Sequence, residues 1–243
     1  MLETISACLS KGDIDKACKM LESYHNTISN KDGGDQILHW AIYQGCLEAV
    51  KLLVEKGLYI KGHDPDLDYE PHPALHQAVF NSKPEIVEYL LKKGARVSEK
   101  ESTRKVGPQM TPIHVLADMK ARYYWDEEEK NILNLLIEYG ALLESIPIAA
   151  AFGTITDVKN LIENGYDIDD FVEYSERTAL HIAVIYNNDD LTYFLIKNNA
   201  DVNFEDGHNC FPLDLCESKT IERMLRTAGG KTYDEFYWWE RSL

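Results

Sequence analysis

One apolar position recurs at nearly constant intervals along the whole chain. The seven copies of it are Ile5, Leu38, Leu75, Ile113, Ile146, Leu180 and Leu213. Successive copies lie 33, 37, 38, 33, 34 and 33 residues apart. A sustained period of this length is typical of repeat architectures, in which each unit packs on its neighbours and no single central core is needed. The periodicity therefore predicts a row of similar units.

A short motif surrounds this position in four copies, and histidine follows the apolar residue in each. The four segments are Gln36–Ala41, Pro73–Ala78, Thr111–Ala117 and Thr178–Ala183. The copies at Ile5, Ile146 and Leu213 are degenerate. Because terminal units must face water on one side, atypical first and last copies are expected.

The second half of each unit carries apolar residues at helical spacing. In one unit these are Leu47, Val50, Leu53 and Val54, and the i, i+3, i+4 pattern predicts a short amphipathic helix. A residue that tolerates left-handed backbone follows each such helix, namely Gly57, Gly94, Gly140, Gly165 and Asn199. Each unit is thus predicted to be a helix, a tight turn, a second helix, a left-handed stop and an extended connection.

The segment Thr178–Ala183 and its echoes resemble the Thr-Pro-Leu-His-x-Ala signature of the ankyrin-repeat family. The resemblance covers nearly all of the chain and implies an all-α solenoid of helix-turn-helix units with extended finger loops. It further implies one domain over 1–243. The expected repeats are 1–33, 34–70, 71–108, 109–143, 144–175, 176–208 and 209–230, followed by an aromatic tail at 231–243.

In this family, the two residues after the alanine-rich part of the first helix face the concave groove. The pairs that match these positions are Tyr43-Gln44, Phe80-Asn81, Ala151-Phe152 and Ile185-Tyr186, and each contains a large apolar ring. Aromatic rings bury much area at low entropic cost and dominate binding hot spots. Alternatively, the rings pack between neighbouring first helices. The candidate protein-binding residues are Tyr43, Tyr69, Glu70, Phe80, Trp125, Phe152, Tyr174 and Tyr186.

The chain is strongly acidic, with a net charge of -16. Such a chain is repelled by nucleic acid and by anionic membranes, so neither is an expected partner. Carboxylates also gather at two predicted finger tips, with Asp66, Asp68 and Glu70 in one and Asp169, Asp170, Glu173 and Glu176 in the other. An acidic rim around an aromatic floor favours a basic protein as the partner. Solubility alone is the alternative explanation of the charge.

One unit departs from the pattern. About eight extra residues separate its helices within Asp118–Lys130, and only six residues connect Gly140 to Ile146, so its finger is almost absent. These changes indicate a local break in the solenoid, or sequence drift without a role. The aromatic tail at 232–240 is predicted either to fold back on the last unit or to offer a second contact to the partner.

No catalytic, cofactor-binding or metal-binding set is evident. The histidines of the motif occupy the family's own histidine position, which the resemblance assigns to local hydrogen bonding. The five cysteines are Cys8, Cys18, Cys46, Cys210 and Cys216, and their scatter and odd number indicate free thiols in a reducing compartment.

These observations predict a non-enzymatic, monomeric cytoplasmic protein that clamps a basic protein and acts as an inhibitor or immunity protein. Three alternatives remain. One is an effector acting in a host cell or an adaptor that brings an enzyme to its substrate. The others are an enzyme that uses the 118–130 insertion and an acidic mimic of nucleic acid.

Overall fold

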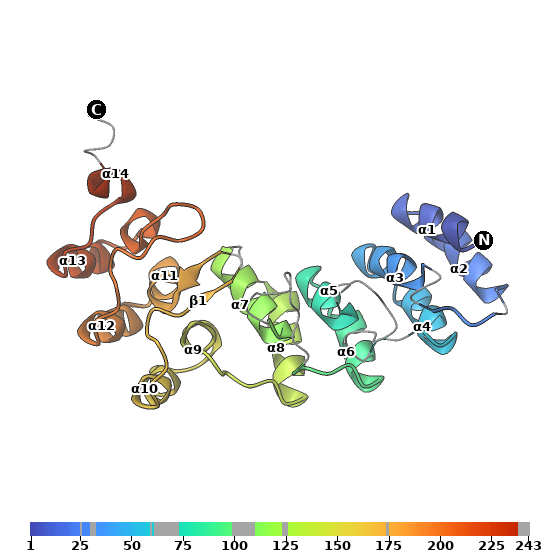
Figure 1. The fold of residues 1–243 in the computed structure, drawn as a ribbon, viewed down its shortest axis with the longest axis horizontal. Coiled ribbons are helices and arrows are strands. Elements are labelled where there is room, and N and C mark those ends of the chain that lie inside the picture. The colour runs from blue at the N-terminus through green and yellow to red at the C-terminus, as the bar shows by residue number, and fades with distance from the viewer. Residues whose placement is uncertain are drawn as a thin grey trace. The chain divides into compact units, whose positions relative to one another are not determined.

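Short helices joined by tight turns make up most of the chain (Figure 1). The computed structural model describes residues 1–24, 26–29, 33–58, 60, 73–98, 110–122, 126–173 and 175–237. The chain divides into two compact units, of which unit 1 comprises Met1–Leu116 and Trp125–Ala141. Unit 2 comprises Ala117–Tyr124 and Leu142–Leu243. The division falls in the repeat that carries the insertion, and the expectation of one domain over 1–243 stays a prediction.

Unit 1 contains two rows of helices. The row of first helices is α1 (Leu2–Ser10), α3 (Gly34–Tyr43) and α5 (Ala74–Phe80). The row of second helices is α2 (Ile14–Glu22), α4 (Leu47–Glu55), α6 (Pro84–Lys92) and α8 (Glu127–Glu138). Helices pack on the next helix of their own row and on the partner within their repeat (Figure 1). The first five residues of α7 (Pro112–Arg122) also belong to this unit.

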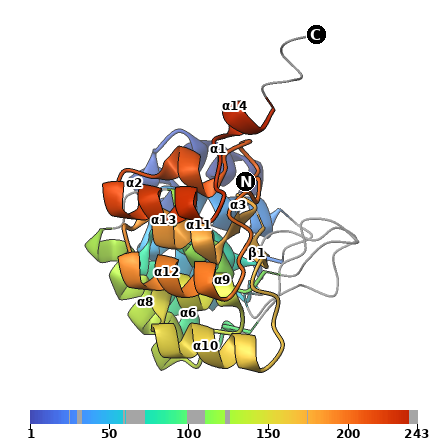
Figure 2. The same cartoon turned by 90° about the vertical axis from the view of Figure 1, so that its left-hand side faces the viewer.

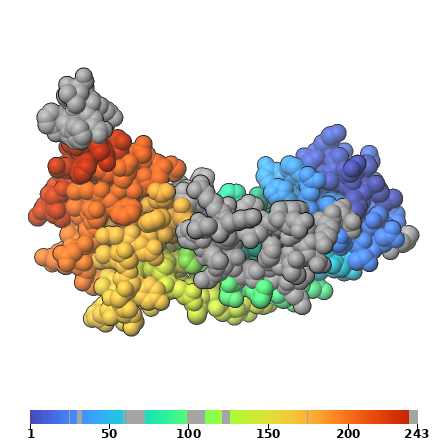
Figure 3. Space-filling view, in the orientation of Figure 1, coloured from blue at the N-terminus to red at the C-terminus, as the bar shows by residue number. Residues whose placement is uncertain are grey.

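Unit 2 repeats this arrangement. Its first helices are α9 (Ile146–Phe152), α11 (Ala179–Ile185) and η2 (Pro212–Leu215), a 3-10 helix of four residues. Its second helices are α10 (Ile155–Glu163), α12 (Asp189–Lys197) and α13 (Lys219–Thr227), followed by the short α14 (Tyr233–Phe236). Figures 1 and 2 show the two rows from perpendicular directions. In the space-filling view, the colour changes in consecutive bands within each unit, because each repeat occupies its own stretch of surface (Figure 3).

The recurring apolar position is buried in all seven repeats, with Ile5, Leu38, Leu75, Ile113, Ile146, Leu180 and Leu213 each at most 6% exposed. The backbone also has the predicted left-handed stops, with φ near +90° at Gly57, Gly94, Gly140 and Gly165 and +65° at Asn199. These angles confirm the predicted helix ends, since glycine and asparagine adopt this conformation most readily.

The motif histidines form local hydrogen bonds, as the family resemblance implied. His114 Nδ1 and His181 Nδ1 lie 2.8 and 2.9 Å from the hydroxyls of Thr111 and Thr178. His76 Nε2 lies 2.9 Å from the carbonyl oxygen of Met110 in the next repeat. These contacts connect the starts of α7 and α11 to their own repeats, and α5 to the following repeat.

Among the described residues, strand pairing occurs in one extended connection, which lies in unit 2. Strands β1 (Phe171–Val172) and β2 (Arg177–Thr178) are antiparallel, with Phe171 opposite Thr178. The long fingers predicted at 58–73 and 95–110 fall mostly outside the described residues. In the repeat with the insertion, α7 and α8 have 11 and 12 residues, against 7 and 9 in α5 and α6. The extra residues of that repeat therefore lengthen its helices.

The last repeat is closed by aromatic residues of the tail. Its first helix is reduced to η2, and the preceding Phe211 is buried. The ring centroids of Tyr233, Phe236 and Tyr237 lie 5.8, 5.1 and 6.2 Å from that of Phe211. The described part of the tail therefore folds back on the last repeat. Residues 238–240 lie outside the described residues.

Candidate functional site

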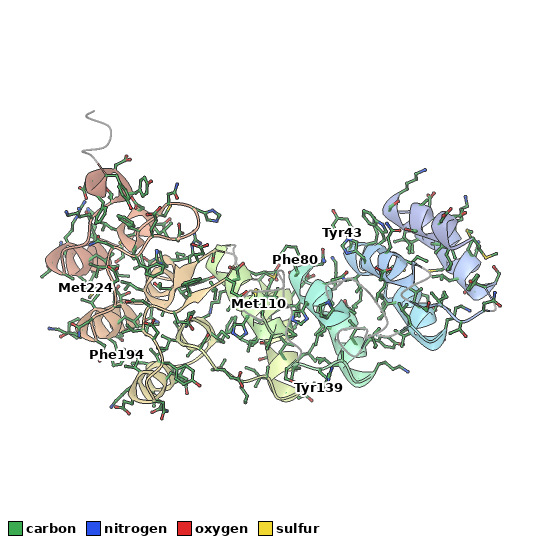
Figure 4. The ribbon with its side chains drawn as sticks, viewed as in Figure 1. Tyr43, Phe80, Met110, Tyr139, Phe194 and Met224 are labelled. Carbon is green, nitrogen blue, oxygen red and sulfur yellow. The ribbon has the colours of Figure 1, made fainter. Side chains whose placement is uncertain are left out.

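Tyr43 and Phe80 are the predicted binding residues of unit 1 that lie within the described part of the chain, and both are exposed. Each is the last residue of a first helix, and the buried stripe of α3, which includes Ala41 and Ile42, turns the Tyr43 ring away from the core. Their side chains are 56% and 53% exposed. Figure 4 shows both on one edge of unit 1, with Tyr139 on the opposite edge. The alternative prediction, that these rings are buried between first helices, does not fit this exposure.

Two further rings extend this edge. Trp40 packs edge-on against Tyr43, with centroids 5.8 Å apart, and against His39 at 5.4 Å. His39 Nδ1 lies 2.9 Å from the amide oxygen of Gln77 on α5, which connects the two first helices. We call His39, Trp40, Tyr43 and Phe80 the unit 1 aromatic surface. It combines supported, partly exposed rings, the form in which aromatic residues contribute most to binding.

In unit 2, Phe152 and Tyr186 lie around a lysine. The Nζ atom of Lys120 lies 5.1 Å from the Phe152 ring centroid and 4.9 Å from that of Tyr186. Lys120 also donates to the carbonyl oxygen of Ala151, and the Tyr186 hydroxyl donates to the carbonyl oxygen of Lys120. These two rings therefore pack on a cation of their own unit, which the sequence prediction of an open aromatic floor did not foresee.

Burial changes the acidity of this cluster. It lowers the pKa of Lys120 to about 8 and raises the pKa of Tyr186 to about 12. Lys120 is therefore still mostly protonated at neutral pH, and it places positive charge between the two rings. The sequence shows only that Lys120 lies in the 118–130 insertion, which does not indicate contact with either ring.

A group of carboxylates lies before and within the hairpin of unit 2. Asp169 Oδ1 accepts a hydrogen bond from the Asp201 backbone N–H at 2.9 Å, and Asp118 Oδ1 accepts one from the Ser175 N–H at 2.9 Å. Burial, together with the nearby charges of Asp170 and Asp118, raises the pKa of Glu173 to about 7. Burial likewise raises the pKa values of Asp169 and Asp170. We call Asp118, Asp169, Asp170 and Glu173 the unit 2 acidic group.

Four predicted site residues lie outside the described residues, namely Tyr69, Glu70, Trp125 and Tyr174. Their part in binding stays a prediction. Within the described ranges, no three His, Cys, Asp or Glu side chains gather closely enough to hold a metal ion. None of the helices described is long and apolar enough to cross a membrane.

In each unit the helices stack in pairs, left-handed residues follow the second helices, and neighbouring first helices pack on one another. This arrangement defines an α-helical repeat solenoid. The ankyrin-repeat family pattern matches residues 5–101, 126–206 and 146–226. The chain therefore belongs to the ankyrin-repeat family, whose repeats are typically non-catalytic and generally bind other proteins.

Similar proteins include the chicken (Gallus gallus) nuclear factor NF-kappa-B p105 subunit, 27% identical over 235 residues. That match covers 87% of this chain and 22% of the relative. The L-asparaginase of Dirofilaria immitis is 27% identical over 207 residues, which cover 78% of this chain and 30% of the relative. The chain thus spans less than a third of the length of either relative.

Two solved structures are similar to this chain at low sequence identity. The ankyrin repeat domain of human ASB11 is 20% identical, with a TM-score of 0.49 and coverage of 93% of this chain and 98% of that one. The ankyrin repeat domain of Bcl-3, described as a member of the IkappaB protein family, is 20% identical with a TM-score of 0.44. That match covers 91% of this chain and 97% of the Bcl-3 chain.

Proposed function

We propose that this chain is a non-enzymatic inhibitor that binds a basic protein through the unit 1 aromatic surface. The observation that carries the proposal is the exposure of Tyr43 and Phe80 at equivalent positions of adjacent repeats. Both rings lie at helix ends, and aromatic side chains have few rotatable bonds, so little side-chain entropy is lost when a partner covers them. Two such rings on neighbouring repeats can insert into a groove or between the side chains of a partner's helix.

Charge supports a basic partner. The chain carries 41 acidic against 25 basic residues, so an approaching cationic protein is attracted over its whole surface. In unit 2, the neighbours that raise the pKa of Glu173 are themselves carboxylates. Complex formation is then expected to weaken as salt increases.

We infer a stoichiometric role in the cytoplasm, with the chain monomeric until it binds. An inhibitor is expected to form one tight 1:1 complex in which the partner loses activity. An adaptor or a host-directed effector would instead form several moderate complexes and leave the partners active. Light scattering coupled to size exclusion, together with the partner's own activity assay, separates these roles.

Site-specific photo-crosslinking tests the surface. A benzophenone amino acid is placed at Tyr43 or Phe80, and at Tyr139 as a control that is 39% exposed on the opposite edge of the same unit (Figure 4). After irradiation in the native cell, positions 43 and 80 are expected to trap the same protein, with an excess of Lys and Arg, and position 139 is expected to trap none. Equal trapping at all three positions, or trapping of an acidic protein, would overturn the proposal.

A further inference from the structure

Two cysteines of unit 1 face one another across adjacent repeats. Cys18 lies on α2 and Cys46 is the N-cap of α4, and their Sγ atoms are 3.8 Å apart. A disulfide bond needs about 2.05 Å between sulfurs, a distance that modest side-chain rotations can supply. All five cysteines lie in the described part of the chain and are free thiols. Cys210 and Cys216 differ, because each directs its Sγ toward a carbonyl oxygen of its own loop.

We propose that Cys18 and Cys46 form a redox-modification site, a dithiol that a small-molecule disulfide converts into a bond between α2 and the start of α4. The Cys18 thiolate attacks one sulfur of the oxidant, forms a mixed disulfide and releases one thiolate. Cys46 then attacks the Cys18 sulfur, closes the protein disulfide and releases the second thiolate. The two protein thiols lose two protons and two electrons, and the electrons reduce the oxidant to two thiols.

The surroundings assign the order of these steps. Cys18 is half-buried, whereas Cys46 is only 7% exposed, so the oxidant reaches Cys18 first. The Cys46 sulfur accepts the Ala49 backbone N–H at 3.4 Å, which holds it at the N-terminus of α4 beside Cys18. The Cys46 sulfur is thereby held 3.8 Å from that of Cys18, close enough to attack a mixed disulfide formed there.

Formation of the mixed disulfide at Cys18 is expected to be slow at neutral pH. Burial is the main cause that raises the pKa of the Cys18 thiol to about 12, with smaller contributions from Cys46, Glu48 and Glu22. The thiolate is the attacking species, so the rate should rise about tenfold for each unit of pH below that value. The site therefore responds to sustained oxidation and not to a brief exposure.

The bond would connect two neighbouring repeats of unit 1 covalently, because α2 packs on α4. Such a link constrains the unfolded chain and so stabilises the folded pair of repeats. The segment between Cys18 and Cys46 contains α3, so the closed loop would include Trp40 and Tyr43 of the unit 1 aromatic surface. This inference does not depend on the proposed inhibitor role.

The test incubates the full chain with oxidised glutathione, then denatures it, alkylates it and maps its peptides by mass spectrometry. The expected product is a linked pair of peptides that contains Cys18 and Cys46, two hydrogens lighter than the reduced pair, with Cys8, Cys210 and Cys216 alkylated. The melting temperature is expected to rise by about 5 °C and to return after reduction with dithiothreitol. Cys18→Ser and Cys46→Ser should each abolish the rise, and Cys216→Ser should retain it.

Three results would overturn the proposal, and each is read from the wild-type chain without relying on a variant that folds. In one, Cys18 and Cys46 are both alkylated after prolonged oxidation at raised pH. In another, glutathione stays attached to Cys18 while Cys46 is alkylated. In the third, Cys18 is linked to a cysteine other than Cys46.

Discussion

At the scale of single residues, unit 2 contains a buried ion pair that connects two of its loops. Arg177 Nε lies 2.9 Å from Asp206 Oδ2, and the two side chains are only 10% and 0% exposed. Asp206 Oδ1 also accepts the backbone N–H groups of His208 and Cys210, each at 2.9 Å. One carboxylate therefore organises two successive fingers, because β2 begins at Arg177 and the loop before η2 contains Cys210.

Replacing this carboxylate tests its structural role. Asp206→Ala leaves Arg177 buried without its partner and removes two loop hydrogen bonds, so we expect a loss of about 3 kcal/mol in the free energy of unfolding. Urea denaturation followed by circular dichroism measures it. The control is Glu163→Gln in the exposed pair Lys159–Glu163, where less than about 1 kcal/mol is expected. Equal losses in the two variants would show that Asp206 does not organise the fingers.

Glu173 gives unit 2 a pH-dependent stability. Its pKa is about 7 in the folded chain against an ordinary value of 4.5, so between these values the folded state keeps a proton that the unfolded state has lost. Its contribution to stability therefore falls as pH rises through this range. Glu173→Gln should raise the melting temperature above about pH 7 and leave it unchanged near pH 4. A constant difference at both pH values would contradict this account.

At the scale of helices and turns, glycine serves two different purposes in unit 1. Gly140 has φ +91° and nothing within 4 Å of the place where a Cβ atom would lie. Gly34, at the start of α3, would bring a Cβ to 2.4 Å from Leu58 Cδ1 and 2.6 Å from the Ser29 carbonyl oxygen. The first glycine is required by backbone conformation and the second by close packing.

These two requirements predict different losses. Gly140→Ala should cost about 1 kcal/mol, the strain of a left-handed alanine. Gly34→Ala should cost about 3 kcal/mol, because backbone as well as a side chain must move. Chemical denaturation of both variants under the same conditions compares them. A larger loss of stability for Gly140→Ala than for Gly34→Ala would contradict this account. It would mean that the close approach of Leu58 and Ser29 does not require glycine at position 34.

The elements of this fold could be predicted from the sequence because the determining signals are local. The anchors such as Leu180, the left-handed Asn199 and the Thr178–His181 contact all lie within one repeat. The position of Lys120 between Phe152 and Tyr186 could not be predicted, since these residues are 32 and 66 positions further along the chain. The pKa of Glu173 depends likewise on Asp118, which lies in another repeat.

At the scale of the whole molecule, the chain is an ankyrin-repeat protein with two compact units. Each unit presents different chemistry, with exposed rings in unit 1 and, in unit 2, partly buried carboxylates and a lysine that packs against two rings. The proposed function assigns the main binding energy to the rings and the choice of a basic partner to the charge.

The affinity of the photo-crosslinked partner, measured by titration calorimetry, tests the central claim most directly. For the double variant Tyr43→Ala and Phe80→Ala, affinity should fall at least about tenfold while the melting temperature stays nearly constant, because both rings are exposed. Tyr139→Ala should bind as the wild type does. Unchanged affinity in the double variant, or an equal loss in Tyr139→Ala, would contradict the account.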